Sequence, residues 1–121
     1  MDTRFSYEGG YVAAKTFFST HPEATAAFCM SDIVAAGAMR ALADLGKRIP
    51  EDVSVFGFDG IDLSNYMIPR LSTVIQPAQL LAEETVNAME ALLDGRNDVG
   101  HTLVDAELVI RESISELKED K

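Results

Sequence analysis

Two apolar, strand-like segments each lead into an acidic residue, and this repeated arrangement constrains the fold most strongly. Residues 25–30 run into Ser31 and Asp32, and residues 53–58 run into Asp59. A helical pattern separates the two segments, and strands alternating with helices of this length are typical of a doubly wound, mostly parallel α/β sheet. Such sheets bind ligands at the carboxyl ends of their strands. The sequence therefore predicts a binding cleft for a small molecule.

The spacing of apolar residues predicts the remaining elements. Ser6 fits the cap of the first helix, Ser31 or Asp32 fits the cap of the second, and Gly46 fits its left-handed end. The segment at 25–30 is apolar on both sides, as a parallel strand buried on both faces requires. The expected order is a helix at 7–20, a strand at 25–30, a helix up to 45, a strand at 53–58, a loop at 60–69, a strand at 71–75, a helix at 77–93 and a strand at 102–110.

The balance of charge argues against direct contact between this chain and nucleic acid. Ten basic residues stand against twenty acidic ones, which gives a net charge of −10. Binding to a phosphate backbone depends on clustered Lys and Arg, and the sequence contains no such cluster. Its longest apolar stretches have the length of strands, so we expect no transmembrane helix. Cys29 is the single cysteine, which excludes an internal disulfide, and it fits a small core residue.

Several motifs follow one another along nearly the whole chain. They are Phe5–Tyr11, Ser31–Leu42, Leu45–Ser54, Gly57–Asp59, Pro69–Pro77 and Leu108–Ser113. Together these motifs resemble the effector-binding domain of the lactose-repressor and galactose-repressor family of bacterial transcription factors. The resemblance implies a three-layer αβα fold of the periplasmic-binding-protein-like type I class, incomplete in this chain. It also implies a cytoplasmic location and no cofactor.

The resemblance further implies a division of the chain. Family members carry an amino-terminal helix-turn-helix, a hinge, a first lobe and the start of a second lobe before the matched region. We therefore expect a carboxy-terminal fragment: residues 1–68 from the second lobe, 69–98 from the crossover and a first-lobe helix, and 99–121 from a return strand and tail. The implied function is part of a sugar- or metabolite-responsive repressor. Such a protein would contact operator DNA only through its missing amino-terminal domain.

Four residues match positions that contact the effector in the family, and a fifth candidate, Asp32, follows one of them. Asp59 matches a ligand-binding aspartate, whose carboxylate can accept two hydroxyl hydrogens, and the alternative is a role in bracing its loop. Phe5 matches an aromatic residue that stacks on the ligand ring, or it anchors the following helix in the core. Ser31 matches a polar residue that contacts sugar hydroxyls, and Asp32 follows it, but both also fit helix capping. Gln76 matches a crossover residue that binds ligand or locks the hinge.

A second group of residues concerns self-association. Tyr66, Met67 and Ile68 match a subunit-contact segment in the family, and the alternative is a loop that plugs one face of the sheet. The helix at 77–94 carries an apolar stripe that would lack its own lobe in a fragment. We therefore expect a homodimer, or an oligomer formed by exchange of that helix or of the closing strand.

Two other classes of function are weighed against the regulator. A periplasmic sugar-binding protein of an ABC transporter shares the fold and the helix start at Ser31, but the stretch at 69–77 favours the regulator. Strand-end aspartates also occur in phospho-acceptor receiver domains, whose additional acidic pair and lysine are missing from this sequence. It also contains no Gly-rich phosphate loop or nucleophile elbow, so we expect no enzyme. His21 and His101 have no Cys or carboxylate at metal-ligand spacing, so we expect no metal site.

Overall fold

The chain divides into two units. The computed structural model describes residues 5–118. The first unit contains the residues up to Ile75 and those from Leu108 onward, and the second unit is Gln76–Glu107. The chain thus leaves the first unit once and returns to it. The division into lobe portions expected from the sequence stays a prediction.

Two helices of the first unit begin at serine caps. The helix α1 covers Tyr7–Thr20, and α2 covers Asp32–Asp44. Ser6 Oγ accepts a hydrogen bond from the Gly9 N–H at 3.0 Å, and Ser31 Oγ accepts one from the Val34 N–H at 3.2 Å. Each serine satisfies a backbone donor that has no partner within its helix. The predicted bounds of both helices are confirmed to within one residue.

Glycines allow α1 and α2 to approach closely. A Cβ atom on Gly37 would overlap the carbonyl oxygen of Tyr7, and one on Gly10 would overlap that of Val34. A methyl group at either position would therefore force the two helices apart. Gly46 follows α2 with a φ of 71°, the left-handed conformation that the sequence predicts for the end of this helix.

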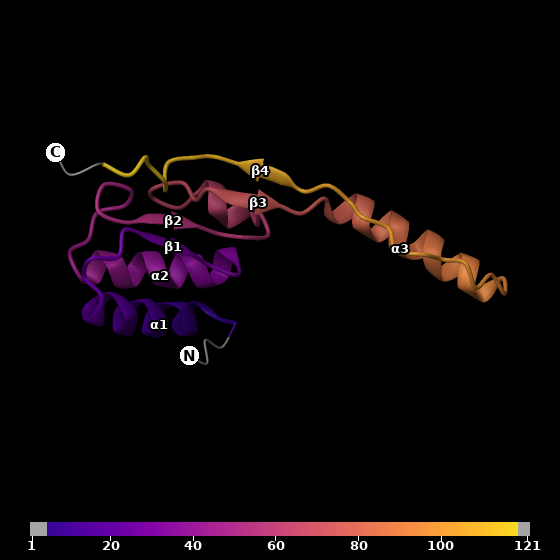
Figure 1. The fold of residues 1–121 in the computed structure, drawn as a ribbon, viewed down its shortest axis with the longest axis horizontal. Coiled ribbons are helices and arrows are strands. Elements are labelled where there is room, and N and C mark those ends of the chain that lie inside the picture. Colours follow the sequence, from indigo (N-terminus) through magenta and orange to yellow (C-terminus); the bar gives the residue numbers. More distant parts are fainter. Residues whose placement is uncertain (1–4, 119–121) are drawn as a thin grey trace. The chain divides into compact units, whose positions relative to one another are not determined.

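The strands form two short two-stranded sheets, which single parallel bridges connect. Strand β1 covers Ala26–Phe28 and pairs in parallel with β2, Ser54–Phe56. Parallel bridges then join Phe56 to Ser72 and Asp59 to Ile75. Strand β3, Thr73–Ile75, pairs with β4, Glu107–Val109. The predicted parallel α/β arrangement is confirmed (Figure 1).

The expectation that β1 is buried on both faces is wrong for the part of the chain that the structure describes. Ala27 and Cys29 point toward the helices, whereas Ala26 and Phe28 point away from them, and Phe28 is 70% exposed. Within residues 5–118 the first unit therefore shows helices on one face of the sheet, which agrees with the incomplete fold expected from the resemblance. Burial of the second face requires a covering element, and within residues 5–118 the first unit supplies none.

The core of the first unit lies between the helices and the sheet. Leu42 from α2, Val53 and Val55 around β2, and Leu71 before β3 are fully buried. Cys29 is also buried, and burial raises the pKa of its thiol to about 11 because the thiolate loses its hydration. The prediction that Cys29 is a core residue is confirmed.

The later elements are shorter than expected. The predicted loop at 60–69 contains one 3₁₀ helix, Asp62–Asn65. The strand expected at 102–110 is limited to Glu107–Val109, because this is the stretch that pairs with β3. A strand needs a neighbour for its backbone groups, and β propensity alone does not provide one.

The second unit consists mainly of one helix. Helix α3 covers Ala78–Leu93 with Pro77 at its cap position, and none of its residues is buried. The chain after the helix turns at Gly95, whose φ is 83°, and runs back along α3 (Figure 1). Apolar side chains along α3 are exposed: Leu80, Leu81, Val86, Met89, Leu92 and Leu93. Among residues 5–118, no helix has the length and apolar character required to cross a bilayer.

Candidate ligand-binding site

The ends of β1 and β2 bring Ser31 and Asp59 to the same edge of the sheet. Phe28 is paired with Phe56 in the parallel register, and Ser31 and Asp59 each follow three residues later. The Asp32 N–H donates to the Phe58 carbonyl at 2.8 Å, so the two chain segments remain adjacent beyond the strands. Helices α1 and α2 both begin at this edge (Figure 1). It is the edge at which open parallel sheets bind ligands.

Asp59 has an unusual backbone conformation. Its φ is 116°, a value that residues other than glycine rarely adopt, and the following Gly60 has a φ of 72°. The Asp59 N–H donates to the Val74 carbonyl at 2.9 Å, and Asp59 forms a parallel bridge with Ile75. Side chains held at such strained positions are common at binding sites. The half-buried Asp59 remains the leading ligand-binding candidate.

Asp32 lies beneath this edge rather than on it. Its side chain is completely buried, with Oδ2 accepting from the Ile61 N–H at 2.8 Å and Oδ1 accepting from the Thr73 hydroxyl at 2.6 Å. Ser31 is also fully buried and caps α2. Of the two alternatives for the cap, the structure therefore selects Ser31. A ligand contact by either residue stays a prediction.

The remaining ligand candidates differ in their surroundings. Phe5 immediately precedes the cap of α1, and its side chain is 62% exposed, so it is not the core anchor considered as its alternative role. Gln76 is the first residue of the second unit and is half-buried. The stacking role of Phe5 and the ligand or hinge role of Gln76 stay predictions.

The segment expected to form subunit contacts has a mixed character. Tyr66 is 77% exposed and Ile68 is 96% exposed, whereas Met67 between them packs against the core of the first unit. Met67 thus fits the alternative of a loop plug, and its two neighbours present apolar groups to the outside. The subunit contact itself stays a prediction.

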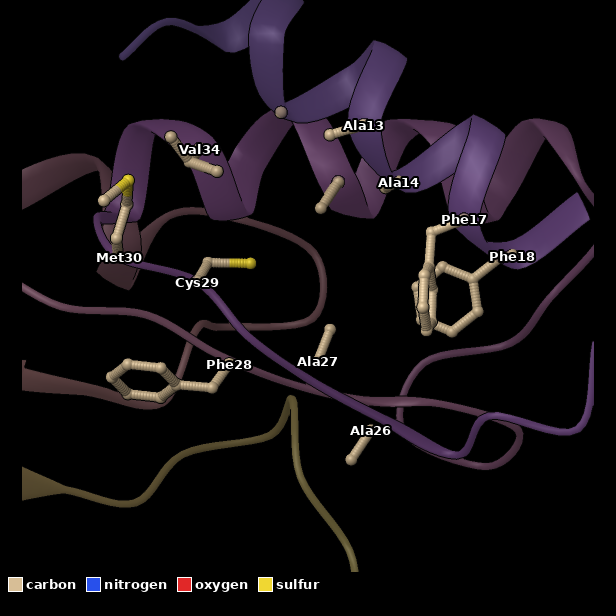
Figure 2. A pocket seen from close by; sticks show the side chains of 12 residues that line it. Ala13, Ala14, Phe17, Phe18, Ala26, Ala27, Phe28, Cys29, Met30 and Val34 are labelled. Carbon is tan, nitrogen blue, oxygen red and sulfur yellow. The ribbon is translucent and has the colours of Figure 1, made fainter. Parts of the chain in front are cut away.

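One cavity of the first unit is separate from the carboxylates. An open groove of about 410 Å³ lies between α1 and the unpaired edge of β1 (Figure 2). Phe17 and Phe18 line it from α1, and Ala27 and Cys29 point into it from the β1 segment. All of its lining residues are apolar or glycine, so it lacks the hydroxyl and carboxylate groups that recognise a sugar.

The histidines have no metal-binding surroundings. His21 is exposed and stacks on Phe17, with ring centroids 4.7 Å apart, and His101 is exposed in the second unit. Within residues 5–118 there is no group of three or more His, Cys, Asp or Glu side chains arranged to hold a metal ion.

The sequence analysis gave no role in the site to Thr73 or Gly57. Thr73 is fully buried and donates to Asp32, and a Cβ atom on Gly57 would overlap Asp32 Oδ1. A signal for Gly57 was present, because a glycine inside a strand pattern often marks a close approach of another group. Thr73 gave no such signal, since threonine is common in strands for its shape alone.

Comparisons with known proteins agree with this architecture. Residues 2–114 match the family model of the periplasmic binding protein-like domain. The ribose operon repressor of Haemophilus influenzae is 37% identical over 119 residues, which cover 98% of this chain and 36% of that protein. The HTH-type transcriptional repressor CytR of Escherichia coli is 36% identical over 110 residues, which cover 90% of this chain and 32% of CytR.

Solved structures give the same result. A LacI family transcriptional regulator from Enterococcus faecalis with bound ribose aligns with a TM-score of 0.86 at 34% identity, covering 98% of this chain and 44% of the regulator. The lac repressor dimer bound to operator and an anti-inducer aligns with a TM-score of 0.85 at 31% identity, covering 91% of this chain and 38% of the repressor. The chain therefore belongs to the periplasmic binding protein-like domain family. Its match is to a segment of the effector domain of lactose-repressor and galactose-repressor regulators, and it spans about a third of the length of the curated relatives it matches.

Proposed function

We propose that this chain forms one side of the effector cleft in a sugar- or metabolite-responsive transcriptional repressor. The observation that carries the proposal is the position of Asp59 at a strand end. Solved structures similar to this chain include regulators with bound ribose and with bound lactose. A carboxylate there can accept hydrogen bonds from two neighbouring hydroxyl groups of a sugar. Phe5 supplies an exposed aromatic face, and Ser31 shapes the backbone at the same strand ends. Gln76 is proposed separately, as a residue that binds ligand or locks the hinge.

The regulator acts by a change in the relative population of two lobe arrangements. An effector that contacts both lobes binds more tightly when they are closed. Effector binding therefore increases the population of the closed arrangement, and this change in population alters the affinity of the repressor for operator DNA. The net charge of −10 opposes contact between this chain and DNA. Operator binding therefore belongs to a part of the protein outside this chain, and the location is cytoplasmic.

A periplasmic sugar-binding protein is the alternative, because it has the same fold. The names of similar curated proteins favour the regulator, since they include a ribose operon repressor and the HTH-type transcriptional repressors PurR and CytR. An enzymatic function has less support. The relatives of this chain are named as repressors and not as enzymes.

Calorimetry on the 121-residue chain tests the idea of a one-sided cleft. Pentoses, hexoses, disaccharides and nucleosides should bind with dissociation constants weaker than about 1 mM, because half of the contacts come from elsewhere. A micromolar dissociation constant for any of these ligands would refute the one-sided cleft.

A second experiment tests Asp59 in the complete repressor. Release of a labelled operator on addition of effector is followed by fluorescence anisotropy. The substitution Asp59→Asn should weaken the effector response about tenfold or more, the magnitude expected for loss of a hydrogen bond to a charged group. Asp62→Asn is the matched control, because Asp62 is exposed nearby in the 3₁₀ helix. Equal responses of the two variants would exclude Asp59 from the site.

Self-association is the third part of the proposal. Tyr66 and Ile68 expose apolar groups on the first unit, and α3 has no buried residue. We expect the chain to form dimers or larger swapped oligomers, because exposed apolar surface is unfavourable in water. Light scattering should give a mass that rises with concentration and falls in a Val86→Glu, Met89→Lys double variant. A compact monomer at high concentration would contradict this.

A further inference from the structure

We propose that Asp32 is a positioning residue, which fixes the backbone around Asp59 and thereby sets the direction of the Asp59 carboxylate toward the effector. The inference rests on the proposed function of Asp59 as a ligand contact. It gives Asp32 a role different from the ligand contact that its place in the sequence motif implies. The observation behind it is that Asp32 binds the chain on both sides of Asp59.

The backbone and the side chain of Asp32 together bracket the segment at 58–61. The Asp32 N–H donates to the Phe58 carbonyl at 2.8 Å, on the amino-terminal side of Asp59. Asp32 Oδ2 accepts from the Ile61 N–H at 2.8 Å, on the carboxy-terminal side. One residue at the start of α2 thus holds the backbone on both sides of Asp59. The two residues inside this bracket are Asp59 and Gly60, and both have a positive φ.

The second oxygen of Asp32 attaches this bracket to β3. Asp32 Oδ1 accepts from the Thr73 hydroxyl at 2.6 Å, and both side chains are completely buried. The Asp59 N–H donates to the Val74 carbonyl, the residue after Thr73. The segment that carries Asp59 is therefore held by α2 on one side and by β3 on the other. Buried hydrogen bonds of this kind restrict motion because water cannot replace them.

Glycines make room for this arrangement. A Cβ atom on Gly57 would overlap Asp32 Oδ1 and would lie 2.8 Å from Leu71 Cδ2. A Cβ atom on Gly60 would lie 2.7 Å from Ile75 Cα. Both distances are too short for real carbon contacts, so the carboxylate and β3 occupy space that any larger residue would need. Gly57 and Gly60 flank the pair Phe58 and Asp59, and the close approach explains why both positions are glycine.

A carboxylate suits this position better than its amide analogue. Both of its partners, the Ile61 N–H and the Thr73 hydroxyl, act as donors toward Asp32. Asparagine has a nearly identical shape but replaces one acceptor by a donor, which would face an N–H or a hydroxyl hydrogen. Asp32 also begins α2, where the positive end of the helix dipole favours a negative charge. Asp32→Asn is therefore a sharp test with little change in volume.

The first experiment measures amide hydrogen exchange in the 121-residue chain. In Asp32→Asn the Ile61 amide should exchange about tenfold faster or more relative to amides of α1, because its acceptor is weakened. Thr73→Val is the second variant, and it removes one hydrogen bond at almost constant shape. It should accelerate exchange at Asp59 and Ile61 by a smaller factor, of about three. If neither variant changes the exchange rate of the Asp59 amide or of the Ile61 amide, the inference is overturned.

The second experiment measures effector and operator affinity in the complete repressor. Thr73→Val and Asp32→Asn should weaken effector binding, Asp32→Asn by about tenfold, while operator affinity without effector stays within about twofold. If Asp32 has only a structural role, the two substitutions would lower the unfolding temperature and leave the effector affinity of the folded protein unchanged. That outcome would also overturn the inference. If Asp59→Asn has no effect on effector binding, the proposed function of Asp59 fails. Amide exchange then still decides whether Asp32 holds the loop.

Discussion

The Ser113 hydroxyl donates a hydrogen bond to the Val55 carbonyl at 2.6 Å, across 58 positions of the chain. The same oxygen accepts a hydrogen bond from the Ser72 N–H at 2.8 Å, and the Val55 N–H donates to the Ser113 carbonyl at 2.8 Å. Ser113 is fully buried. The returning segment is therefore joined to β2 and to the residues before β3 by three buried hydrogen bonds.

We predict that Ser113→Ala lowers the free energy of unfolding by about 1–3 kcal/mol, because it leaves the Ser72 N–H and the Val55 carbonyl with fewer partners. Urea denaturation followed by circular dichroism measures this change. Ser115→Ala is the control, since the hydroxyl of Ser115 bonds to the Pro50 carbonyl at the surface, and its effect should stay within about 0.5 kcal/mol. Equal losses in both variants would show that burial of the Ser113 hydroxyl is unimportant.

The contact between α1 and α2 gives a second prediction. Alanine usually stabilises a helix relative to glycine by about 1 kcal/mol. Gly37→Ala should instead destabilise the protein by about 1–3 kcal/mol, because the added methyl group overlaps the Tyr7 carbonyl. Denaturant titration distinguishes the two signs. Ser19→Ala on the exposed side of α1 should be nearly neutral, and a stabilised Gly37→Ala variant would refute the close packing.

The reactivity of Cys29 gives a third prediction. Its pKa is raised from the ordinary value of 9.0 to about 11, because burial disfavours the thiolate. At mildly alkaline pH the thiolate fraction is then about 100-fold lower than for a free cysteine. Labelling with a disulfide reagent should be slow in the native chain and fast in urea. Equal rates under both conditions would contradict the burial.

The exposed pair of Arg48 and Asp52 gives a prediction about pH. The Arg48 side chain donates hydrogen bonds to both carboxylate oxygens of Asp52, at 2.8 and 3.0 Å, and the Arg48 backbone N–H donates another at 2.8 Å. The side-chain hydrogen bonds from Arg48 contribute most, and the backbone hydrogen bond adds to them. Together they hold the pKa of Asp52 well below its ordinary value of 3.8. Because the folded-state pKa is lowered, the stabilisation is complete above about 3.8 and disappears as the pH falls through the lower folded-state value.

Asp52→Asn should therefore reduce the unfolding midpoint in urea slightly near neutral pH, and the difference should vanish in strong acid. The effect is small because water screens an exposed pair. Glu51→Gln, next to it, is the control and should show no such pH dependence. A difference between Asp52→Asn and the original chain that persists in strong acid would point to packing rather than charge.

Local signals in the sequence were sufficient to predict the helices and their ends. The serine caps at Ser6 and Ser31, and the left-handed Gly46, act within a few residues of where they lie, so a single sequence contains what is needed. The strand-end placement of Ser31 and Asp59 was predictable for a related reason. Parallel strands of similar length bring their carboxyl ends to one edge.

Burial and partners were harder to predict, because they depend on residues far apart in the chain. The apolar pattern around Phe28 predicts burial, yet Phe28 is 70% exposed, since burial depends on what covers the sheet. The role of Asp32 was missed for the same reason. Its partners Ile61 and Thr73 lie 29 and 41 positions away, and no local pattern connects them.

The pairing of β3 with β4 places the two points where the chain leaves and re-enters the first unit next to each other. Neighbouring strands lie about 4.8 Å apart, a gap that a tight turn of a few residues can close. We therefore expect that a short linker can replace residues 76–106, which lie between β3 and β4, without rerouting the remainder. The first unit is in this sense modular, because its chain connectivity does not depend on the second unit, although ligand binding can depend on it.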